Sequence, residues 1–330
     1  MSPARRAPGS RIRHAILAAA LLGVAGCGST PASAHMAPAP LMSMPPEVSS
    51  AAPATAVSVP PPSAPASSVP AAPAPPPAAE CPLPKSGFDC DFQRRFASAT
   101  AYVAKRPGTV GIVLRDRQTG AVWRNDHAGD LTWTASTIKL AMTVDLLLRD
   151  KSGAITLSAA DRGLIQAMLH SSDDNAADTL WFQYAGADHL AYNNAFPGYG
   201  MTSLAPQRGF TEFYPYWGFQ KCTADDLDRL VNYVLGRLPA DLRNYIVGQM
   251  RGVAPNQQWG VWAAGPAAAP GNKNGWSSEQ GGWVMNTVGF AGPGERYTLA
   301  VMNNLRGKGG YDAGKATVSE VARIILAGRA

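Results

Sequence analysis

The sequence has few of the residues that build metal sites and dithiol sites. Only 4 cysteines and 5 histidines occur in 330 residues. No two cysteines have the Cys-x-x-Cys spacing that is typical of structural zinc sites and redox dithiols, and the histidines are scattered. We therefore predict no bound metal and no cofactor.

Excess charge is also scarce beyond the first residues. The formal net charge of the chain is +6. Residues 1–26 contain four arginines and no acid, so the remainder carries a net charge of only about +2. No other stretch has a cluster of basic residues. Nucleic acid, which binds to such clusters, is therefore not an expected partner.

A long apolar run is missing as well. The apolar stretch Ala15–Val24 is shorter than the roughly 20 residues that a membrane-spanning helix needs. It follows a group of arginines and precedes small residues, which predicts an export signal over residues 1–26. The end of this segment, Val24-Ala25-Gly26-Cys27, resembles the lipobox of bacterial lipoproteins. The resemblance implies cleavage before Cys27 and a diacylglycerol group on its sulfur.

Two acyl chains are enough for a stable membrane anchor. The resemblance therefore implies an exported lipoprotein of the cell membrane that faces the exterior of the cell envelope and contacts the membrane through lipid alone. The alternative is a plain signal peptide in which Cys27 has no special role.

Residues 28–80 contain no aromatic residue, few charges, and mostly Ala, Pro and Ser. Such a composition cannot bury enough apolar surface to fold, and its proline runs favour extended chain. We predict that residues 27–80, beginning with lipidated Cys27, form a disordered tether. The alternative is a linker whose length has no particular role. Residues 81–330 are long enough for one folded domain with a substantial core.

Three cysteines remain in that domain, Cys81, Cys90 and Cys222. A disulfide is expected outside the cytoplasm. The sequence leaves all three pairings open.

Hydrophobic periodicity predicts an order of helices and strands. The domain should begin with a helix and a hairpin, continue with helices, and end with two or three strands and a helix. The segments are a helix over Asp91–Lys105, strands at Val110–Leu114 and Ala121–Trp123, helices from Ser136 and from Ser158, a further helix through Trp181, strands at Trp283–Gly289 and Tyr297–Met302, and a helix over Gly314–Leu326.

The most informative stretch runs from Ser136 to Lys139, at the start of an apolar helical run. Residues three apart on a helix share a face, with Cβ atoms roughly 5–6 Å apart. An amine that gives up its proton can activate a nearby hydroxyl as a nucleophile. The backbone N–H groups of a first helical turn are unpaired and favour negative charge. One turn of chain can thus hold a nucleophile, a base and half of an oxyanion site. The alternative is a solvated helix face.

Two later segments form a set of three candidate motifs together with Ser136–Lys139. One is His170–Asn175, between two predicted helices, and the other is Gly271–Trp276, before an apolar strand. A Ser-x-x-Lys motif, a Ser-Asp element and a Lys-x-Gly element in this order resemble the motifs of class A β-lactamases and penicillin-binding proteins. The second and third segments are also similar to those of mycobacterial LppW-type lipoproteins. Taken alone, the second segment is a helix cap and the third is a turn.

The resemblance implies an α+β fold of the β-lactamase/DD-peptidase type over nearly all of residues 91–328. In this fold an antiparallel sheet is packed by the terminal helices, and a second subdomain is all-helical. It also implies a serine acyl-enzyme hydrolase or transferase. The expected ligand is a peptidoglycan peptide or a β-lactam-like small molecule, and the expected state is a monomer.

Roles for single residues also come from the resemblance. Ser136 would attack a carbonyl group, and Lys139 would take or relay its proton. Ser172 would pass a proton to the leaving nitrogen, while Lys273 would hold Ser172 and attract a substrate carboxylate. The backbone N–H groups of Ser136 and Trp276 would form the oxyanion hole. The substrate-binding set would be Asp174, Asn175, Asn274, Gly275 and Trp276.

The chain departs from the family pattern at three places. Asp174 stands where Asn is usual, and a carboxylate there would keep the lysines protonated. Asn274 replaces a Thr or Ser whose hydroxyl binds the substrate carboxylate. No glutamate suited to activating water is evident before Thr223, where Glu212 is the only acid. These departures predict slow deacylation, and they support the alternative of an inactive envelope-binding lipoprotein on the same scaffold.

Six aromatic residues lie within residues 208–221, and they would form either a ligand-binding wall or a self-packed loop. They are Phe210, Phe213, Tyr214, Tyr216, Trp217 and Phe219.

Overall fold

The computed structural model describes residues 87–210, 216–278 and 281–329. The predicted signal segment, Cys27, the tether, Cys81 and Glu212 lie outside the described residues. None of the helices within these ranges has the length and hydrophobicity to cross a bilayer.

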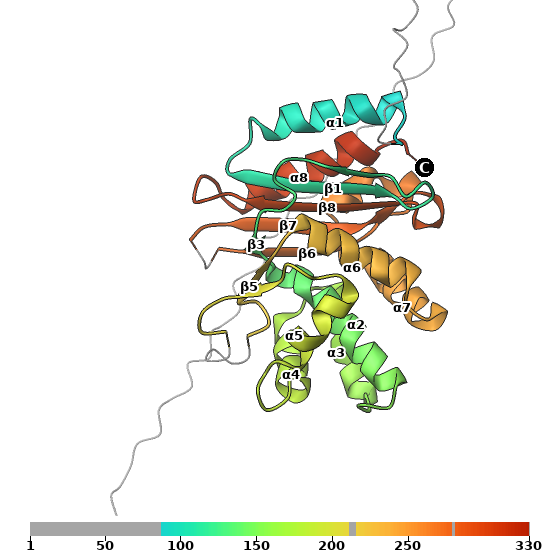
Figure 1. The fold of residues 1–330 in the computed structure, drawn as a ribbon, viewed down its shortest axis with the longest axis vertical. Helices are drawn as coiled ribbons and strands as arrows, with labels where there is room; N and C mark the ends of the chain where they lie inside the picture. Colours follow the sequence, from blue (N-terminus) through green and yellow to red (C-terminus); the bar gives the residue numbers. More distant parts are fainter. Residues whose placement is uncertain (1–86, 211–215, 279–280, 330) are drawn as a thin grey trace, which may run out of the picture. The chain divides into compact units, whose positions relative to one another are not determined.

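A five-stranded antiparallel sheet forms the centre of the domain, with the strands in the spatial order β2-β1-β8-β7-β6 (Figure 1). The chain enters the sheet through a hairpin and returns to it after the helices, as the sequence predicts. The strands are β1 (Thr109–Asp116), β2 (Val122–Arg124), β6 (Gly271–Ser277), β7 (Val284–Ala291) and β8 (Tyr297–Asn304). The predicted third motif is therefore a strand at the edge of the sheet, and the interpretation of that segment as a turn is wrong.

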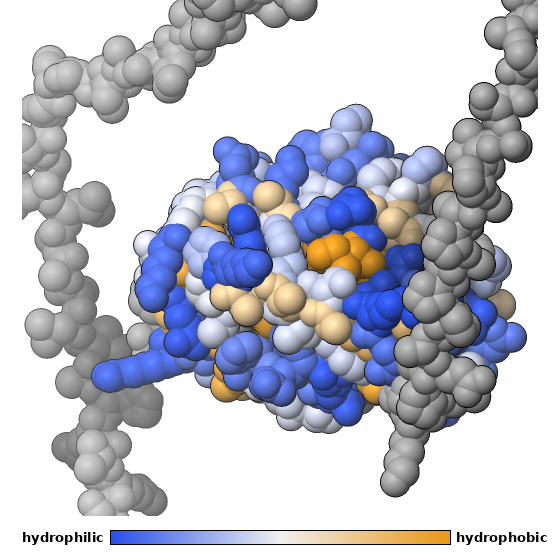
Figure 2. All heavy atoms as spheres, turned by 90° about the horizontal axis from the view of Figure 1, so that it is seen from above, coloured by the Kyte–Doolittle hydropathy of each residue, from blue (hydrophilic) through white to orange (hydrophobic). Residues whose placement is uncertain are grey.

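Helices α1 (Cys90–Val103) and α8 (Tyr311–Leu326) cover one face of this sheet (Figure 1). Asp89 caps α1 by accepting a hydrogen bond from the backbone N–H of Phe92. Arg95 of α1 donates to three carbonyl groups at the C-terminal end of α8, which satisfies groups that a helix end leaves unpaired. The predicted packing of the sheet by the first and last helices is thereby confirmed. The side that carries α1 is mostly hydrophilic at its surface (Figure 2).

The other face of the sheet packs against an all-helical region. Its helices are α2 (Ile138–Lys151), α3 (Ala159–His170), α4 (Asp174–Tyr184), α5 (Ala191–Ala195), α6 (Ala224–Gly236) and α7 (Ala240–Arg251). A small second sheet has the order β3-β5-β4, from β3 (Thr132–Trp133), β5 (Gln220–Cys222) and β4 (Ala205–Pro206). Short 3-10 helices connect these elements at Ala135–Thr137, Phe196–Tyr199, Pro255–Gln257, Gly260–Ala264, Pro266–Ala268 and Pro293–Glu295.

Side-chain alternation along the strands divides the core between the two faces. In β1, Ile112 and Leu114 belong to the core under α1 and α8, whereas Val113 belongs to the core of the helical region. Strand β8 alternates in the same way. Successive side chains of a strand point to opposite faces, so a fully apolar strand predicts a sheet that is covered on both sides.

Helix α2 is buried along almost its whole length, because the sheet lies on one side and other helices on the rest. Helix α3 starts at the predicted cap, where Ser158 and Asp161 form a reciprocal capping box. Two of the three cysteine pairings are wrong, because Cys222 is a free, buried thiol in the core of the helical region. The pairing Cys81–Cys90 stays a prediction.

Candidate active site

The Ser136 turn is held in a strained and well-anchored conformation. It forms a 3-10 turn, Ala135–Thr137, that leads directly into α2. Ala135 has φ +44°, a region that costs a residue with a side chain about 1–3 kcal/mol. The side-chain amide of Asn286 in β7 donates to the carbonyl groups of Trp133 (2.8 Å) and Thr134 (3.2 Å), directly before the turn. These bonds tie the segment that carries Ser136 to the sheet.

Gly275 brings the edge strand β6 against this turn. A Cβ atom at residue 275 would lie 2.8 Å from the backbone nitrogen of Ser136 and 2.7 Å from that of Thr137. The backbone of Ser136 therefore lies directly beside the strand that carries Trp276. The oxyanion hole formed by the backbone N–H groups of Ser136 and Trp276 stays a prediction.

Replacement of Gly275 by alanine should therefore displace the strand from the turn. We expect acylation of Ser136 to slow by about 100-fold or more, because misplacing reacting groups by about 1 Å has an effect of that size. Mass spectrometry of the covalent adduct with benzylpenicillin, taken at successive times, measures this acylation rate. The control is Gly163→Ala in α3, where an added Cβ meets open space and a helical alanine stabilises by about 0.5–1 kcal/mol. Equal rates in both variants would contradict the close packing at Gly275.

The second segment reaches the site through its backbone. Ser172 has φ +64°, a left-handed conformation that turns the chain between α3 and α4. Lys139 donates from Nζ to the carbonyl groups of Ser172 (2.8 Å) and Asp173 (3.2 Å) and forms an ion pair with the Asp174 carboxylate. Asp173 also caps α4 through the N–H of Ala176. The segment is therefore both a helix cap and part of the site.

The third segment meets the second through side chains. Lys273 of β6 donates from Nζ to Ser172 Oγ at 2.8 Å and to the carbonyl group of Asn274 at 2.8 Å. Segments that begin at residues 136, 172 and 273 thus converge on one place, with Ser172 in contact with both lysines. Both lysine side chains are buried.

Burial dominates the electrostatics of this pair. Loss of hydration lowers the pKa of Lys139 from its ordinary 10.5, and the neighbouring Asp174 carboxylate opposes this shift. The pKa of Lys273 is lowered well below 10.5, first by complete burial and then by the positive charge of Lys139. Among the described residues, Lys139 has a carboxylate partner and Lys273 has none within hydrogen-bonding distance. The Asp174 carboxylate therefore favours the ammonium form of Lys139, and burial favours the neutral amine of Lys273.

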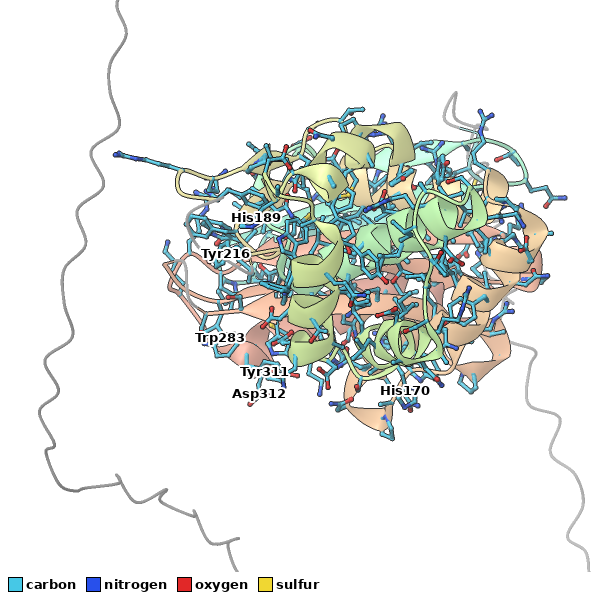
Figure 3. The ribbon with its side chains drawn as sticks, turned by 90° about the horizontal axis from the view of Figure 1, so that it is seen from below. His170, His189, Tyr216, Trp283, Tyr311 and Asp312 are labelled. Atoms are coloured by element: carbon cyan, nitrogen blue, oxygen red, sulfur yellow. The ribbon has the colours of Figure 1, made fainter. Side chains whose placement is uncertain are left out.

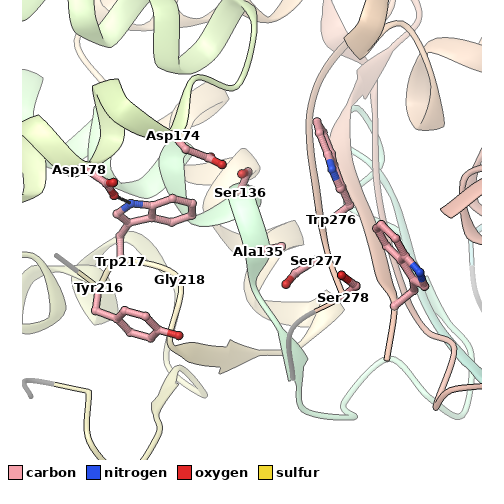
Figure 4. Close-up of a pocket in the computed structure, with 11 residues that line it drawn as sticks. Ala135, Ser136, Asp174, Asp178, Tyr216, Trp217, Gly218, Trp276, Ser277 and Ser278 are labelled. Atoms are coloured by element: carbon pink, nitrogen blue, oxygen red, sulfur yellow. Dashed lines mark hydrogen bonds between the residues drawn. The ribbon is translucent and has the colours of Figure 1, made fainter. Parts of the chain in front are cut away.

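A cavity of about 450 Å³ opens in front of Ser136 (Figure 4). Asp174, Asp178 and Trp217 form one wall, and Trp276 stands on the opposite wall. The full lining is Ala135, Ser136, Asp174, Asp178, Tyr216, Trp217, Gly218, Trp276, Ser277, Ser278 and Trp283. Figure 3 shows Tyr216 and Trp283 at the same edge of the molecule and His170 away from them. His170 ends α3, as the sequence predicts.

Two residues of the predicted substrate-binding set lie elsewhere. Asn274 is buried, and its amide donates to the carbonyl groups of Gln257 (2.8 Å) and Trp259 (3.2 Å). Asn175 is exposed on α4 and is not part of the cavity lining. Asn274 alternates along β6 with Lys273, whose side chain meets Ser172, and Asn175 is one step along α4 from Asp174.

The described rings of the aromatic segment have two kinds of surroundings, and their role in binding a ligand stays a prediction. Phe210 packs on Trp181 and Phe219 stacks on Trp133, so these rings belong to the core and its edge. Tyr216 and Trp217 line the cavity. Phe213 and Tyr214 lie outside the described residues.

Sequence reasoning missed Asp178. Its carboxylate lines the cavity and accepts a hydrogen bond of 2.6 Å from Trp217 Nε1 (Figure 4). The available signal was its position four residues after Asp174 on a predicted helix, which places both carboxylates on one face. Among the described residues, no group of three or more His, Cys, Asp or Glu side chains could hold a metal ion.

Comparison with solved structures identifies the fold. The domain matches a β-lactamase from Xanthomonas campestris with a TM-score of 0.60 and 18% identity, over 72% of this chain and 97% of the other. A β-lactamase from Burkholderia vietnamiensis matches with a TM-score of 0.58 and 19% identity, over 70% and 95%. An ancestral class A β-lactamase matches with a TM-score of 0.57 and 19% identity, over 70% and 98%. The chain therefore has the class A β-lactamase fold, which confirms the predicted α+β class.

Sequence comparison finds a second kind of relative. The protein LppW of Mycobacterium tuberculosis, named as a lipoprotein, is 29% identical over 253 residues, which cover 74% of this chain and 77% of LppW. LppW of Mycobacterium bovis matches to the same extent. No protein-family model matches the chain.

Proposed function

We propose that this protein is a serine acyl-enzyme-forming hydrolase or transferase, exported as a lipoprotein, that acts on peptidoglycan-peptide amides or β-lactams. The observation that carries the proposal is the convergence on Ser172, whose hydroxyl contacts Lys273 and whose carbonyl group contacts Lys139. The β-lactamase fold and the similarity to a protein named as a lipoprotein support it.

The charge states suggest the direction of proton transfer. Lys139 donates to three acceptors, one of them a carboxylate, which favours its ammonium form. Its proposed role is to stabilise negative charge near Ser136 rather than to accept a proton. The neutral amine of Lys273 can accept a proton through the Ser172 hydroxyl, which is both donor and acceptor. This assignment moves the base from Lys139, where the family resemblance puts it, to the pair of Ser172 and Lys273.

The acylation step then balances as follows. Ser136 Oγ bonds to the carbonyl carbon of the substrate while its proton passes through Ser172 to Lys273. The bond from that carbon to the leaving nitrogen breaks, and the nitrogen receives a proton from Ser172, which Lys273 replaces. The backbone N–H groups of Ser136 and Trp276 would bind the oxyanion. Losing one such donor costs roughly 3–4 kcal/mol of transition-state stabilisation.

Deacylation should be the slow step. The two carboxylates in the cavity are both engaged, Asp174 with Lys139 and Asp178 with Trp217. Both belong to α4, not to the segment before Thr223 where the family resemblance puts a water-activating glutamate, and no suitable glutamate is evident there. A long-lived acyl-enzyme is the expected result.

Intact-mass analysis after incubation with benzylpenicillin tests the proposal. We expect a covalent adduct of one penicillin per protein that persists for minutes or longer. A folded protein that forms no adduct at millimolar penicillin would overturn the proposal.

The rate of adduct formation should increase with pH. Below the lowered pKa of Lys273 its side chain is an ammonium group, which cannot accept a proton; above that pKa it is an amine. The rate should therefore fall about tenfold for each pH unit below this pKa. Rates measured between about pH 5 and pH 9 give the profile. The range is extended to lower pH as long as the domain stays folded, and a rate that is flat down to that limit would rule out Lys273 as the proton acceptor.

Replacement of Asp174 by asparagine sharpens this test. The Asp174 carboxylate raises the pKa of both lysines, so its removal should move the profile to lower pH and increase the rate on the acidic side. Asp126→Asn, an exposed change elsewhere in the chain, should leave the profile unchanged.

A binding protein without catalysis is the second candidate. The observations that favour it are the complete engagement of Lys139 and the burial of Asn274, which leaves the third motif without a polar side chain toward the substrate. This candidate predicts that muropeptides bind equally to the wild type and to Ser136→Ala, and that no turnover occurs. Measurable turnover would exclude it.

A further inference from the structure

The cavity lacks the groups that would bind a substrate carboxylate. Among the described residues of its lining, none is Lys, Arg or His. Lys273 is buried and donates to Ser172 Oγ, and burial lowers its pKa well below 10.5, which disfavours the charge that was expected to attract a carboxylate. Asn274 is turned to Gln257 and Trp259. An anionic group in this cavity would therefore meet no cationic side chain among the described residues of the lining.

The carboxylates that line the cavity favour a positively charged ligand. Asp174 and Asp178 lie one turn apart on α4 and face the cavity (Figure 4). The side chain of Asp174 is 71% exposed, so it can meet a ligand while it holds Lys139. Asp174 is paired with Lys139, whereas Asp178 is hydrogen-bonded to the neutral indole of Trp217, so the α4 wall keeps one uncompensated negative charge.

Aromatic rings add to this preference. Tyr216, Trp217, Trp276 and Trp283 line the cavity, and the face of an aromatic ring attracts cations. Trp217 already shows the effect, since Lys139 Nζ lies 4.4 Å from its ring centroid. Trp276 is supported from behind by Trp259 and Tyr311, with ring centroids 5.9 Å and 6.0 Å away. The walls are therefore built of fixed rings and carboxylates.

We propose that this cavity recognises an ammonium group on its ligand, held at the α4 wall by Asp174 and Asp178 and by the aromatic rings. The inference rests on the proposed function in one respect: the ligand is then an acyl donor whose carbonyl carbon lies at Ser136. The substrate class is an amine-bearing peptide amide or ester, in which the amine lies close to the bond that is cleaved. A donor with a carboxylate at the same position is disfavoured by Asp174 and Asp178.

Equilibrium binding tests this proposal separately from catalysis. The full chain with Ser136→Ala is titrated with benzyltrimethylammonium, benzyl alcohol and phenylacetate, and tryptophan fluorescence is the readout. We expect the cation to bind about tenfold more tightly than the neutral alcohol, in line with cation–π and carboxylate contacts, and the anion to bind most weakly. Phenylacetate binding as tightly as the cation would overturn the proposal.

Asp178→Asn in the same background is the matched variant. Asparagine keeps an oxygen that can accept the hydrogen bond of Trp217 Nε1, so the ring stays in place and only the charge is lost. The preference for the cation should fall by about fivefold. Asp126→Asn is the control and should leave the preference for the cation unchanged. A preference that Asp178→Asn does not change would also overturn the proposal.

The last test compares the rates at which three penicillins acylate the wild type. Their phenylacetyl side chains carry an α-amino group, an α-hydrogen or an α-carboxylate. We expect rates in that order, and equal rates would count against the proposal. If none of them forms an adduct while the cation preference persists, recognition of ammonium is supported and the proposed acyl-enzyme function fails.

Discussion

Replacement of Ser136 by alanine should abolish the covalent adduct with benzylpenicillin and leave the domain folded. The change removes one oxygen atom, and none of the three acceptors of Lys139 is Ser136 Oγ. The turn keeps its anchors through Asn286. Loss of a serine nucleophile costs about 10⁴-fold or more in rate. Intact-mass analysis and the thermal unfolding temperature measure the two effects.

The control for this variant is Ser152→Ala, at the other end of α2. The Ser152 hydroxyl is exposed and donates only to the carbonyl group of Arg149. Its loss should leave the adduct unchanged. An adduct of wild-type yield on Ser136→Ala would show that another nucleophile reacts and would refute the assignment of Ser136.

Replacement of Lys273 by methionine should abolish acylation and at the same time stabilise the fold. The variant removes the proton acceptor, which we expect to slow acylation by about 10²–10⁴-fold. It also replaces a fully buried amine by an apolar chain of similar size. Replacing a buried ion pair by apolar residues of similar volume is often neutral or stabilises by about 1–4 kcal/mol, and we expect a gain within this range for the lone buried amine of Lys273, since functional residues often carry such a cost.

The sign of the stability effect follows from the shifted pKa. The folded pKa of Lys273 lies below its unfolded value of 10.5, so the unfolded chain binds more protons between these two values. The free energy of unfolding of the wild type should therefore rise with pH over this interval, up to about pH 10.5. Lys273→Met should lack this rise.

Chemical denaturation at several pH values measures this effect. Lys105→Met, which changes an exposed lysine at the end of α1, should keep both the rise and the acylation. If the free energy of unfolding of the wild type does not rise with pH below about 10.5, or if Lys273→Met keeps the same rise, the pKa of Lys273 is not lowered and its neutral form is not the correct description.

The convergence of the three motifs could be predicted from the sequence because each one had a local signal. Helical spacing put Ser136 and Lys139 on one face, and the order of the three motifs matched a known set. The apolar pattern of β1, β7 and β8 predicted a buried sheet, and the capping residues at Ser158 and before α4 predicted helix starts. Each of these signals comes from residues that are close together in the sequence.

The partners within the site could not be predicted in this way. The contacts of Lys139 with the carbonyl groups of Ser172 and Asp173 depend on the left-handed conformation of Ser172, which is unusual for serine and has no local sequence signal. The direction of Asn274 depends on which face of the edge strand β6 meets the site. The position of Trp217 over Lys139 depends on how a long loop folds back on α4.

Mapping of the acylated residue in the wild type tests the central claim most directly. The protein is incubated with benzylpenicillin and digested, and the modified peptide is identified by tandem mass spectrometry. We predict that the acyl group is found on Ser136 alone. An acyl group on Ser172 or on a lysine, or a folded protein that carries none, would contradict the account.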